Sequence, residues 1–232
     1  MTMDEISNRV LAQLEPENLI SEGQSWQQRK SIQTRVTILD AAVDCLQTHG
    51  YGRTTTQLIA EKAGISRGAM LHHYATKQDL IAAVIDYTVY KRMELFLHGV
   101  RALKDTDRIT QMAGIEIFWE SLLTREFGAY LELAVAARTD PELAEIFLPK
   151  ARRYDQTELA EVIRAFPEWA NLPEAYALAM DYCNAALQGL LINREIWSEE
   201  SHRVLRRFVG QTIAMILAGD LTLPPAVSSK AG

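Results

Sequence analysis

The stretch "TTTQLIAEKAGISRGAMLHHYATKQDL", residues 54–80, constrains the fold of this chain more than any other segment. Apolar residues recur in it at helical spacing, Gly64 interrupts the pattern, and a second short helical run follows at once. Gly64 supplies the residue without Cβ that a tight turn requires. Four apolar residues are expected to make the buried contacts between the runs: Ile59, Ala63, Ile65 and Met70. The pattern predicts a helix-turn-helix, whose second helix enters the major groove of DNA.

Hydroxyl-bearing residues stand where both short helices are expected to begin. Thr54 with Gln57 three residues later indicates a capping box for the first helix, although Thr55 is an alternative N-cap. Ser66 is expected to cap the second helix. The backbone amides at both helix starts, together with the hydroxyls of Thr55 and Thr56, suit the phosphates of DNA.

The second short helix, "SRGAMLHHY", is too short and too polar for a core element. Arg67 is suited to guanine O6 and N7 or to a phosphate, and Gly68 and Ala69 let the backbone approach base edges closely. Lys77, at the start of the next helix, is placed for another phosphate. The residues expected on the exposed face are Ser66, Arg67, Gly68, Ala69, His72 and His73, with simple solvent exposure as the alternative for His72.

The charge distribution agrees with a DNA-binding segment, although the whole chain carries a net charge of −6. Residues 29–92 hold nine basic and five acidic side chains, which gives +4. Residues 1–28 carry −4 and residues 93–232 carry −6 by the same count. A basic segment within an acidic protein is typical of nucleic-acid binding.

Almost the whole chain is expected to be helical, because Gly and Pro are sparse and no stretch alternates with period two. The sequence predicts an all-α fold, with an N-terminal three-helix DNA-binding domain followed by a larger helical domain for ligand binding and dimerisation. The predicted helices cover residues 33–50 with Gly50 as an αL cap, Thr76 to Leu103, 108–122, 126–138, a helix from Pro141 that Pro149 kinks or splits, and two closing helices, the last from Ser198 or Ser201 to Gly219.

The expected domain boundaries follow from these helices. Residues 1–30 form a loose or helical extension, 31–78 the DNA-binding domain, 79–222 the larger domain and 223–232 a frayed tail. No apolar stretch is long and uncharged enough to span a bilayer, and the acidic N-terminus is no export signal. Cys45 and Cys183 are expected to be buried free thiols. The cytoplasm is the expected compartment.

The segment "GYGRTTTQLIAEKAGISRGAMLHHYATKQDL" resembles the TetR family of bacterial one-component regulators. The resemblance covers about residues 33–85, and the all-α remainder agrees with it as architecture. One departure is Leu71, where many members have a Tyr whose hydroxyl contacts the DNA backbone; Tyr74, where Phe is common, is expected in the core. The resemblance implies DNA contacts by Thr56, Gln57, Arg67, Gly68, Ala69, His73 and Lys77.

The resemblance also implies a small-molecule pocket in the larger domain. Aromatic side chains with polar tips need hydrogen-bond partners when buried, so they are the candidates to line this pocket, although core packing explains them equally well. Arg138 is a candidate counterion for an anionic ligand or, alternatively, a cation at a helix end. The aromatic candidates for effector binding are Trp119, Tyr130, Tyr154 and Tyr182.

The last two helices are the expected dimer surface, as two antiparallel helices from each subunit would make a four-helix interface. Small residues allow close approach and an amphipathic stripe supplies apolar area, but a monomer's core would show the same stripes. Dimerisation is favoured because two half-sites suit a helix-turn-helix. The candidate interface residues are Ala186, Gly189, Leu190, Val204, Phe208, Ile213 and Ile216.

The sequence therefore predicts a homodimeric regulator, most simply a repressor, that binds a pseudo-palindromic operator and is released by a small-molecule effector. The alternatives are an activator or ligand-independent DNA-binding protein, and a helical ligand-binding or scaffold protein with vestigial DNA binding. No catalytic motif is present and no cofactor is expected. His72 and His73 are not expected to bind a metal, because adjacent side chains on a helix diverge.

Overall fold

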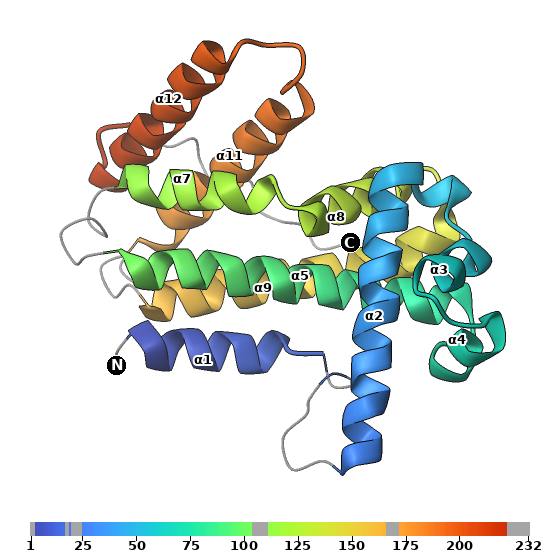
Figure 1. Ribbon diagram of the computed structural model, residues 1–232. Coiled ribbons are helices and arrows are strands. Elements are labelled where there is room, and N and C mark those ends of the chain that lie inside the picture. The colour runs from blue at the N-terminus through green and yellow to red at the C-terminus, as the bar shows by residue number, and fades with distance from the viewer. Residues whose placement is uncertain (1–2, 17–18, 20–24, 104–110, 166–171, 222–232) are drawn as a thin grey trace. The chain divides into compact units, whose positions relative to one another are not determined.

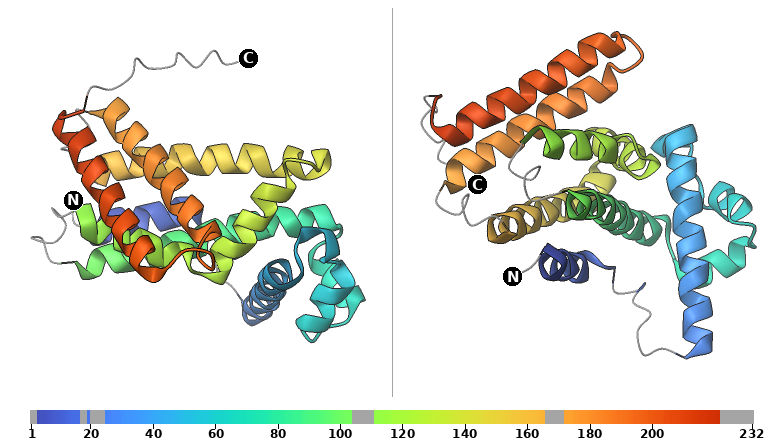
Figure 2. Two further views of the ribbon diagram at one scale, coloured as in Figure 1. Left: turned by 90° about the horizontal axis from the view of Figure 1, so that it is seen from above. Right: turned by 60° about the vertical axis from the view of Figure 1, so that its left-hand side comes forward.

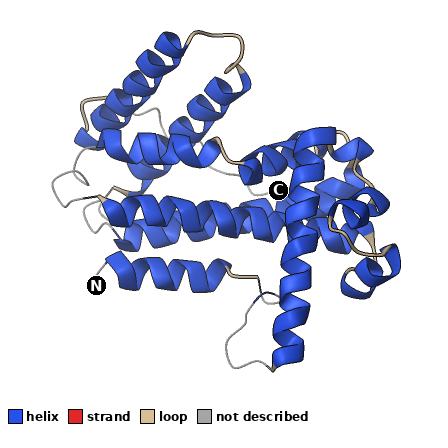
Figure 3. Cartoon of the chain, in the orientation of Figure 1, coloured by secondary structure: helices blue, strands red, loops and turns tan. Residues whose placement is uncertain are grey.

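Every regular element that the structure describes is a helix (Figure 3). The computed structural model describes residues 3–16, 19, 25–103, 111–165 and 172–221. Within these ranges each helix is too short or too polar to cross a membrane. The predicted all-α fold is confirmed.

The chain divides by its internal contacts into two units. Unit 1 comprises Met1–His98 and Leu123–Glu158, and unit 2 comprises Gly99–Leu122 and Leu159–Gly232. The predicted domain boundaries, after residues 30, 78 and 222, stay predictions. The helices are α1 (Met3–Leu14), α2 (Trp26–His49), the short 3-10 helix η2 (Tyr51–Arg53), α3 (Thr56–Lys62), α4 (Arg67–His73), α5 (Lys77–Ala102), α7 (Gln111–Leu122), α8 (Arg125–Ala136), α9 (Pro141–Ala165), α11 (Pro173–Ile192) and α12 (Glu199–Ala218) (Figure 1).

Helix α2 begins at Trp26, about two turns before the predicted start, so that boundary was wrong. A capping box explains the earlier start: the Ser25 amide donates to Oε1 of Gln28 at 2.8 Å, and the Gln28 amide donates to Oγ of Ser25 at 3.4 Å. The N-terminal extension, predicted to be loose or helical, contains the helix α1, whose Val10 and Leu14 are buried.

Gly50 ends α2 as predicted, but its conformation differs from the expected αL cap. Its φ of 74° is positive while its ψ of 166° is extended, a combination that L residues rarely adopt. Its amide still donates to the Leu46 carbonyl at 2.9 Å. A Cβ at this position would lie 3.0 Å from Oε1 of Glu132, so the close approach of α8 favours glycine as well.

Local signals at other helix ends act as the sequence predicts. Thr76 and Asp79 exchange two bonds of 3.0 Å, each side chain accepting from the other's amide, at the start of α5. Ser198 caps α12, and Gly219 ends that helix in the αL conformation with φ 76° and ψ 15°.

Pro149 does not split its helix, because α9 runs unbroken from Pro141 to Ala165. That part of the prediction was wrong. Proline removes one backbone hydrogen bond from a helix, but tertiary contacts hold this one on both sides of the proline. Phe147 is buried in the core, and Nζ of Lys150 lies 2.7 Å from Oδ2 of Asp86 on α5.

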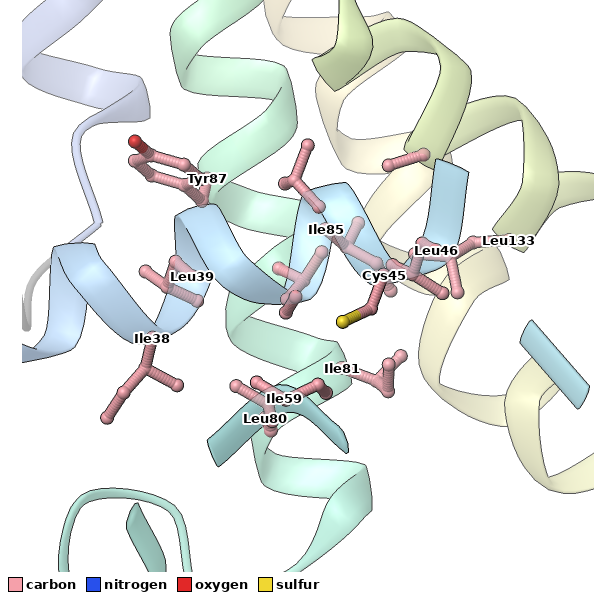
Figure 4. Close-up of a cluster of buried hydrophobic side chains, with 14 of the residues drawn as sticks. Ile38, Leu39, Cys45, Leu46, Ile59, Leu80, Ile81, Ile85, Tyr87 and Leu133 are labelled. Atoms are coloured by element: carbon pink, nitrogen blue, oxygen red, sulfur yellow. The ribbon is translucent and has the colours of Figure 1, made fainter. Parts of the chain in front are cut away.

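One buried cluster joins the helix-turn-helix to the rest of unit 1 (Figure 4). Ile59 of α3 and Met70 of α4 are fully buried in it, and Leu133 of α8 belongs to the same cluster. Burying a side chain of this size contributes about 1.5–3 kcal/mol. The short helices α3 and α4 therefore owe their stability to α2, α5 and α8, because isolated helices of seven residues do not persist in water.

Unit 2 is built on α7, α11 and α12, and both views of Figure 2 show α11 and α12 side by side. Each of the three helices contributes a buried apolar face to the unit. The buried residues include Ile115, Trp119 and Leu122 of α7, Ala179, Cys183, Leu187 and Leu190 of α11, and Val209, Ile213 and Ile216 of α12.

Candidate nucleic-acid interface

Both helices of the predicted helix-turn-helix begin at hydroxyl caps. Oγ1 of Thr55 accepts from the Leu58 amide at 3.2 Å, and Oγ of Ser66 accepts from the Ala69 amide at 3.1 Å. Of the two alternatives for α3, the cap is thus Thr55. Thr54 is buried, and its hydroxyl donates to the Gly50 carbonyl at 2.8 Å. These bonds fix where α3 and α4 begin and leave other first-turn amides able to meet phosphates.

The turn between α3 and α4 is a Schellman motif centred on Gly64. The Ile65 amide donates to the Ala60 carbonyl at 3.0 Å, and the Gly64 amide donates to the Glu61 carbonyl at 3.1 Å. Gly64 has a φ of +68°, and nothing lies within 4 Å of the place where its Cβ would be. The backbone conformation of this turn therefore favours glycine, whereas no neighbouring atom would obstruct a Cβ.

Helix α4 places a polar and basic face in solvent. Only Met70 of its seven residues is fully buried. Leu71 is 37% exposed and offers no hydroxyl to a DNA phosphate. The exposed residues of the capping position and the helix are Ser66, Arg67, Gly68, Ala69, Leu71 and His72, while His73 is half-buried.

The start of α3 adds further polar groups to the same motif. Thr55 and Gln57 are exposed and Thr56 is half-buried. Nε2 of Gln57 donates to Oε1 of Glu61 at 3.0 Å in the absence of DNA. That bond orients the Gln57 side chain along the surface of α3 and must be exchanged if Gln57 is to contact a phosphate or a base.

Lys77, at the start of α5, is held over Tyr51. Its Nζ lies 4.2 Å from the centre of the Tyr51 ring and donates to the Tyr51 carbonyl at 3.5 Å. Burial lowers the pKa of Lys77, and nearby Asp140 opposes that shift. The ammonium group of Lys77 is thereby held in one place at the N-terminus of α5.

The rings of His72 and His73 lie edge to face at the end of α4, with ring centres 5.6 Å apart and planes at 68°. The pKa of His73 lies below its ordinary value because of burial, and the positive charges of Arg35 and His72 lower it further. Arg35 belongs to α2, so the field of a basic side chain from another helix reaches the end of α4.

Sequence reasoning missed the side chains that attach the helix-turn-helix to α8. The guanidinium of Arg125 binds both Asp40 and Asp44 of α2, and Oε1 of Glu132 accepts from the Tyr51 amide at 2.7 Å. Nζ of Lys62 on α3 lies 3.4 Å from Oδ2 of Asp44. Arg125 and Glu132 are each about 80 residues from these partners in sequence, and no local pattern marks them.

Three of the candidate effector residues lie in unit 1. The ring of Tyr130 packs 5.1 Å from that of Phe147, and the guanidinium of Arg92 lies 5.3 Å from its centre. The Tyr154 hydroxyl donates to Oδ1 of Asp86, and burial with that carboxylate raises the pKa of Tyr154. Arg138 is exposed just after α8.

The other two effector candidates, Trp119 and Tyr182, lie in unit 2. Trp119 is buried, with the guanidinium of Arg206 5.0 Å from its ring centre and the ring of His202 at 6.4 Å. Nε of Arg206 donates to Oε1 of Glu116 at 3.2 Å. Tyr182 is half-buried on α11. Trp119 thus belongs to a buried group of aromatic and cationic side chains between α7 and α12.

The candidate dimer residues separate into two groups by burial. Val204 and Phe208 on α12 are 52% and 58% exposed. Leu190, Ile213 and Ile216 are buried inside unit 2, where they pack among α7, α11 and α12, and Ala186 and Gly189 are half-buried. Among the described residues, no three His, Cys, Asp or Glu side chains come together as metal ligands.

A capped helix-turn-helix with a polar, exposed second helix defines a DNA-binding protein. Residues 38–84 match the family model described as bacterial regulatory proteins, tetR family. Residues 38–84 therefore form a DNA-binding domain of this family, and the relatives that match the chain are named transcriptional regulators.

Named relatives agree with this assignment. The HTH-type regulator Rv2912c of Mycobacterium tuberculosis is 29% identical over 148 residues, which cover 64% of this chain and 75% of that protein. The HTH-type transcriptional repressor AcnR of Corynebacterium jeikeium is 32% identical over 88 residues, covering 36% and 47%. The multidrug binding protein EbrR, solved with imidazole, shares the fold with a TM-score of 0.58 at 16% identity, covering 83% of this chain and 97% of EbrR.

Proposed function

We propose that this regulator is a homodimeric repressor that binds a pseudo-palindromic operator and is released by a small-molecule effector. The observation that carries the proposal is the recognition helix α4, which exposes Arg67, Gly68, Ala69 and His72 and is anchored by one buried residue, Met70. Arg67 reads a guanine and Gly68 with Ala69 allow close approach to base edges. Thr55, Thr56, Gln57, Ser66, His73 and Lys77 complete the proposed DNA contacts. Such a protein acts in the bacterial cytoplasm.

The exposed apolar face of α12 supports dimerisation. Val204, Phe208 and Met215 are 52%, 58% and 42% exposed, and their spacing of four and seven residues places them on one side of the helix. A contiguous apolar stripe in water marks an interaction surface. A second copy of the same helix would cover this stripe in an isologous interface and present two α4 helices to two half-sites.

The aromatic and cationic side chains of unit 1 support a small-molecule effector. Arg92 lies over both Phe127 and Tyr130, at 4.5 and 5.3 Å from the ring centres. Such groups recognise aromatic or anionic ligands. EbrR, which shares the fold, binds imidazole, and AcnR is named a repressor. An effector acts only if it binds the DNA-incompetent state more tightly, and a tenfold preference supplies about 1.4 kcal/mol per site.

Selection of bound fragments from the source genome tests the DNA-binding half of the proposal. The best fragment is then titrated at several salt concentrations against scrambled DNA of equal length. A palindromic site bound about a thousandfold more tightly than scrambled DNA is the expected result. Equal, weak binding to all fragments contradicts it, and a transcription assay that shows activation at the selected site contradicts the repressor assignment.

A further inference from the structure

The first turns of α2 extend beyond the packing that holds the rest of that helix. All residues from Ser25 to Lys30 are exposed, and Ile32 is the one buried side chain between Trp26 and Thr37. Unsupported helical turns are marginal in water, so ordering them calls for a compensating interaction. The Ser25–Gln28 capping box nevertheless fixes the start of the helix.

Polar and basic residues of this segment share a face with Ile38, which packs in the cluster that contains Ile59 and Met70 of α3 and α4. Residues three, four, seven, eight and eleven positions before Ile38 lie on the same side of the helix. These residues are Arg35, Thr34, Ser31, Lys30 and Gln27. The side of α2 that packs on the helix-turn-helix therefore continues toward the N-terminus of α2 as a polar stripe.

The charge of this segment is purely positive. No Asp or Glu occurs between Ser25 and Leu39, whereas Arg29, Lys30 and Arg35 do. Arg35 lies one helical turn before Ile38, which shares the buried cluster with Met70 of α4, so the basic stripe begins near α4. The positive charge of Arg35 also lowers the pKa of His73 at the end of α4. Lys30 lies over the exposed Trp26 ring, with Nζ 5.5 Å from its centre.

The reach of the segment fits a DNA backbone. Helices rise about 1.5 Å per residue, so Lys30 lies about 8 Å farther along α2 than Arg35. In a DNA duplex, the phosphates of one strand follow one another about every 3.4 Å along the duplex axis. The two cations therefore span about two phosphates when α2 lies along that axis. Figure 1 and the right-hand view of Figure 2 both show the N-terminal turns of α2 extending past α4.

We propose that Lys30 and Arg35, with Gln27 and Ser31, form a second DNA-binding surface that contacts backbone phosphates flanking the half-site read by α4. This inference rests on the proposed function, because it requires that α4 bind DNA. The surface contributes affinity for duplex outside the half-site and carries no base sequence information of its own. It assigns a role to the basic part of α2 that precedes the family match at residue 38.

Two duplexes test the proposal with the full-length protein. The short duplex contains the two half-sites alone, and the long one adds about eight base pairs of neutral flank on each side. The wild type is expected to bind the long duplex about tenfold more tightly, and the K30Q/R35Q variant to bind both about equally. On the long duplex, the slope of log affinity against log salt concentration is expected to be shallower in the variant, by about 0.9 for each phosphate that it no longer neutralises.

Arg29→Gln provides a matched control, because it removes one positive charge from a neighbouring position. Six residues separate Arg29 from Arg35, which places the two side chains about 120° apart around the helix. R29Q is expected to keep the tenfold gain on the long duplex. Equal loss in R29Q and K30Q/R35Q would mean that general charge, and not this face, carries the effect, and would overturn the proposal.

The remaining outcomes separate this inference from the function on which it rests. If the wild type binds both duplexes equally and both far better than scrambled DNA, the second surface is absent while the regulator stands. If neither duplex exceeds scrambled DNA, the proposed function itself fails. Circular dichroism and sedimentation accompany each variant, and a changed mass in K30Q/R35Q would assign the surface to a second copy of the chain instead. Should the double variant misfold, the exposed K30Q alone is expected to lose about half of the gain.

Discussion

Arg125, at the start of α8, binds two carboxylates one helical turn apart on α2. Its Nη2 lies 2.5 Å from Oδ1 of Asp40, and its Nη1 lies 2.8 Å from Oδ1 of Asp44. Lys62 of α3 pairs with the other oxygen of Asp44 at 3.4 Å. The first helix of the DNA-binding motif is therefore connected to α8 through a chain of three charged side chains.

Replacing Arg125 by Met should weaken DNA binding although Arg125 itself is not proposed to touch DNA. The ion pairs are about a third exposed, so the free energy of unfolding is expected to fall by about 1 kcal/mol, measured in urea. Operator affinity should fall several-fold because α3 and α4 lose a support, while the salt dependence of binding stays the same. Arg125→Lys keeps the charge without the bidentate fork and should recover part of the loss. A reduced salt dependence in R125M would instead place Arg125 on a phosphate.

Asp44 should contribute a pH-dependent part of the stability. Burial alone would raise its pKa, but Arg125 and Lys62 lower it below the ordinary value of 3.8. A carboxyl with a lowered folded-state pKa contributes stability above its unfolded pKa and loses it as the pH falls through the folded value. The difference in unfolding free energy between wild type and Asp44→Asn should thus be largest near neutral pH and shrink below about pH 4. A difference that stays constant across that range would contradict the assignment.

Gly64 should be replaceable by asparagine at less cost than by alanine. Its φ of +68° disfavours a Cβ, whereas no neighbouring atom obstructs one. Gly64→Ala is expected to destabilise the protein by about 1 kcal/mol, and Gly64→Asn by less, because Asn tolerates the left-handed region. Thermal unfolding of the two variants compares them directly. Equal loss in both would indicate a steric conflict and not a conformational one.

Arg67 and Lys77 should affect DNA binding in different ways. Arg67→Ala is expected to cost about 1–3 kcal/mol at the operator and to relax its sequence preference, because the guanidinium that reads a base is removed. Lys77→Gln should weaken operator and scrambled DNA alike and lower the salt dependence. Titrations on both DNAs at several salt concentrations separate the two effects. Unchanged sequence preference in Arg67→Ala would show that Arg67 does not read a base.

Phe208→Glu should dissociate the proposed dimer and leave the fold of unit 2 intact. Phe208 is 58% exposed on α12, so its replacement removes no core contact. A charge placed in an apolar interface is costly, and the sedimentation mass is expected to fall from dimer to monomer at micromolar concentration. Ser201→Glu is a control, because Ser201 is an exposed position in the first turn of the same helix. A dimer that survives Phe208→Glu would move the interface elsewhere.

Features that depend on neighbours in sequence were predictable. The caps at Ser66 and Thr76 and the turn at Gly64 are decided within a few residues, and these predictions were confirmed. Of the two alternatives for α12, the cap is Ser198, whereas the capping box from Thr54 and the αL conformation of Gly50 were wrong. The start of α2 was missed although its signal is local: Ser25 followed by Gln28 is a capping box that would have marked Trp26.

Features that depend on distant partners were not predictable from one sequence. Arg125 and Glu132 meet α2 and η2 across about 80 residues, and nothing in their local pattern identifies those partners. Pro149 stays within α9 because Phe147 and Lys150 anchor the helix on other elements, which overrides the local preference. Burial inside unit 2 likewise distinguishes Ile213 from exposed Phe208, although both lie on the amphipathic α12.

The single buried anchor of α4 has a consequence for how this protein changes over evolutionary time. Met70 is the residue of α4 that the core requires, so substitutions at the surrounding exposed positions cost the fold little. Under the proposed function, the choice of DNA target is thereby uncoupled from the stability of the fold. A duplicated gene is free to acquire a new set of target promoters through a few changes within this one short helix, and still express a folded protein at every intermediate step.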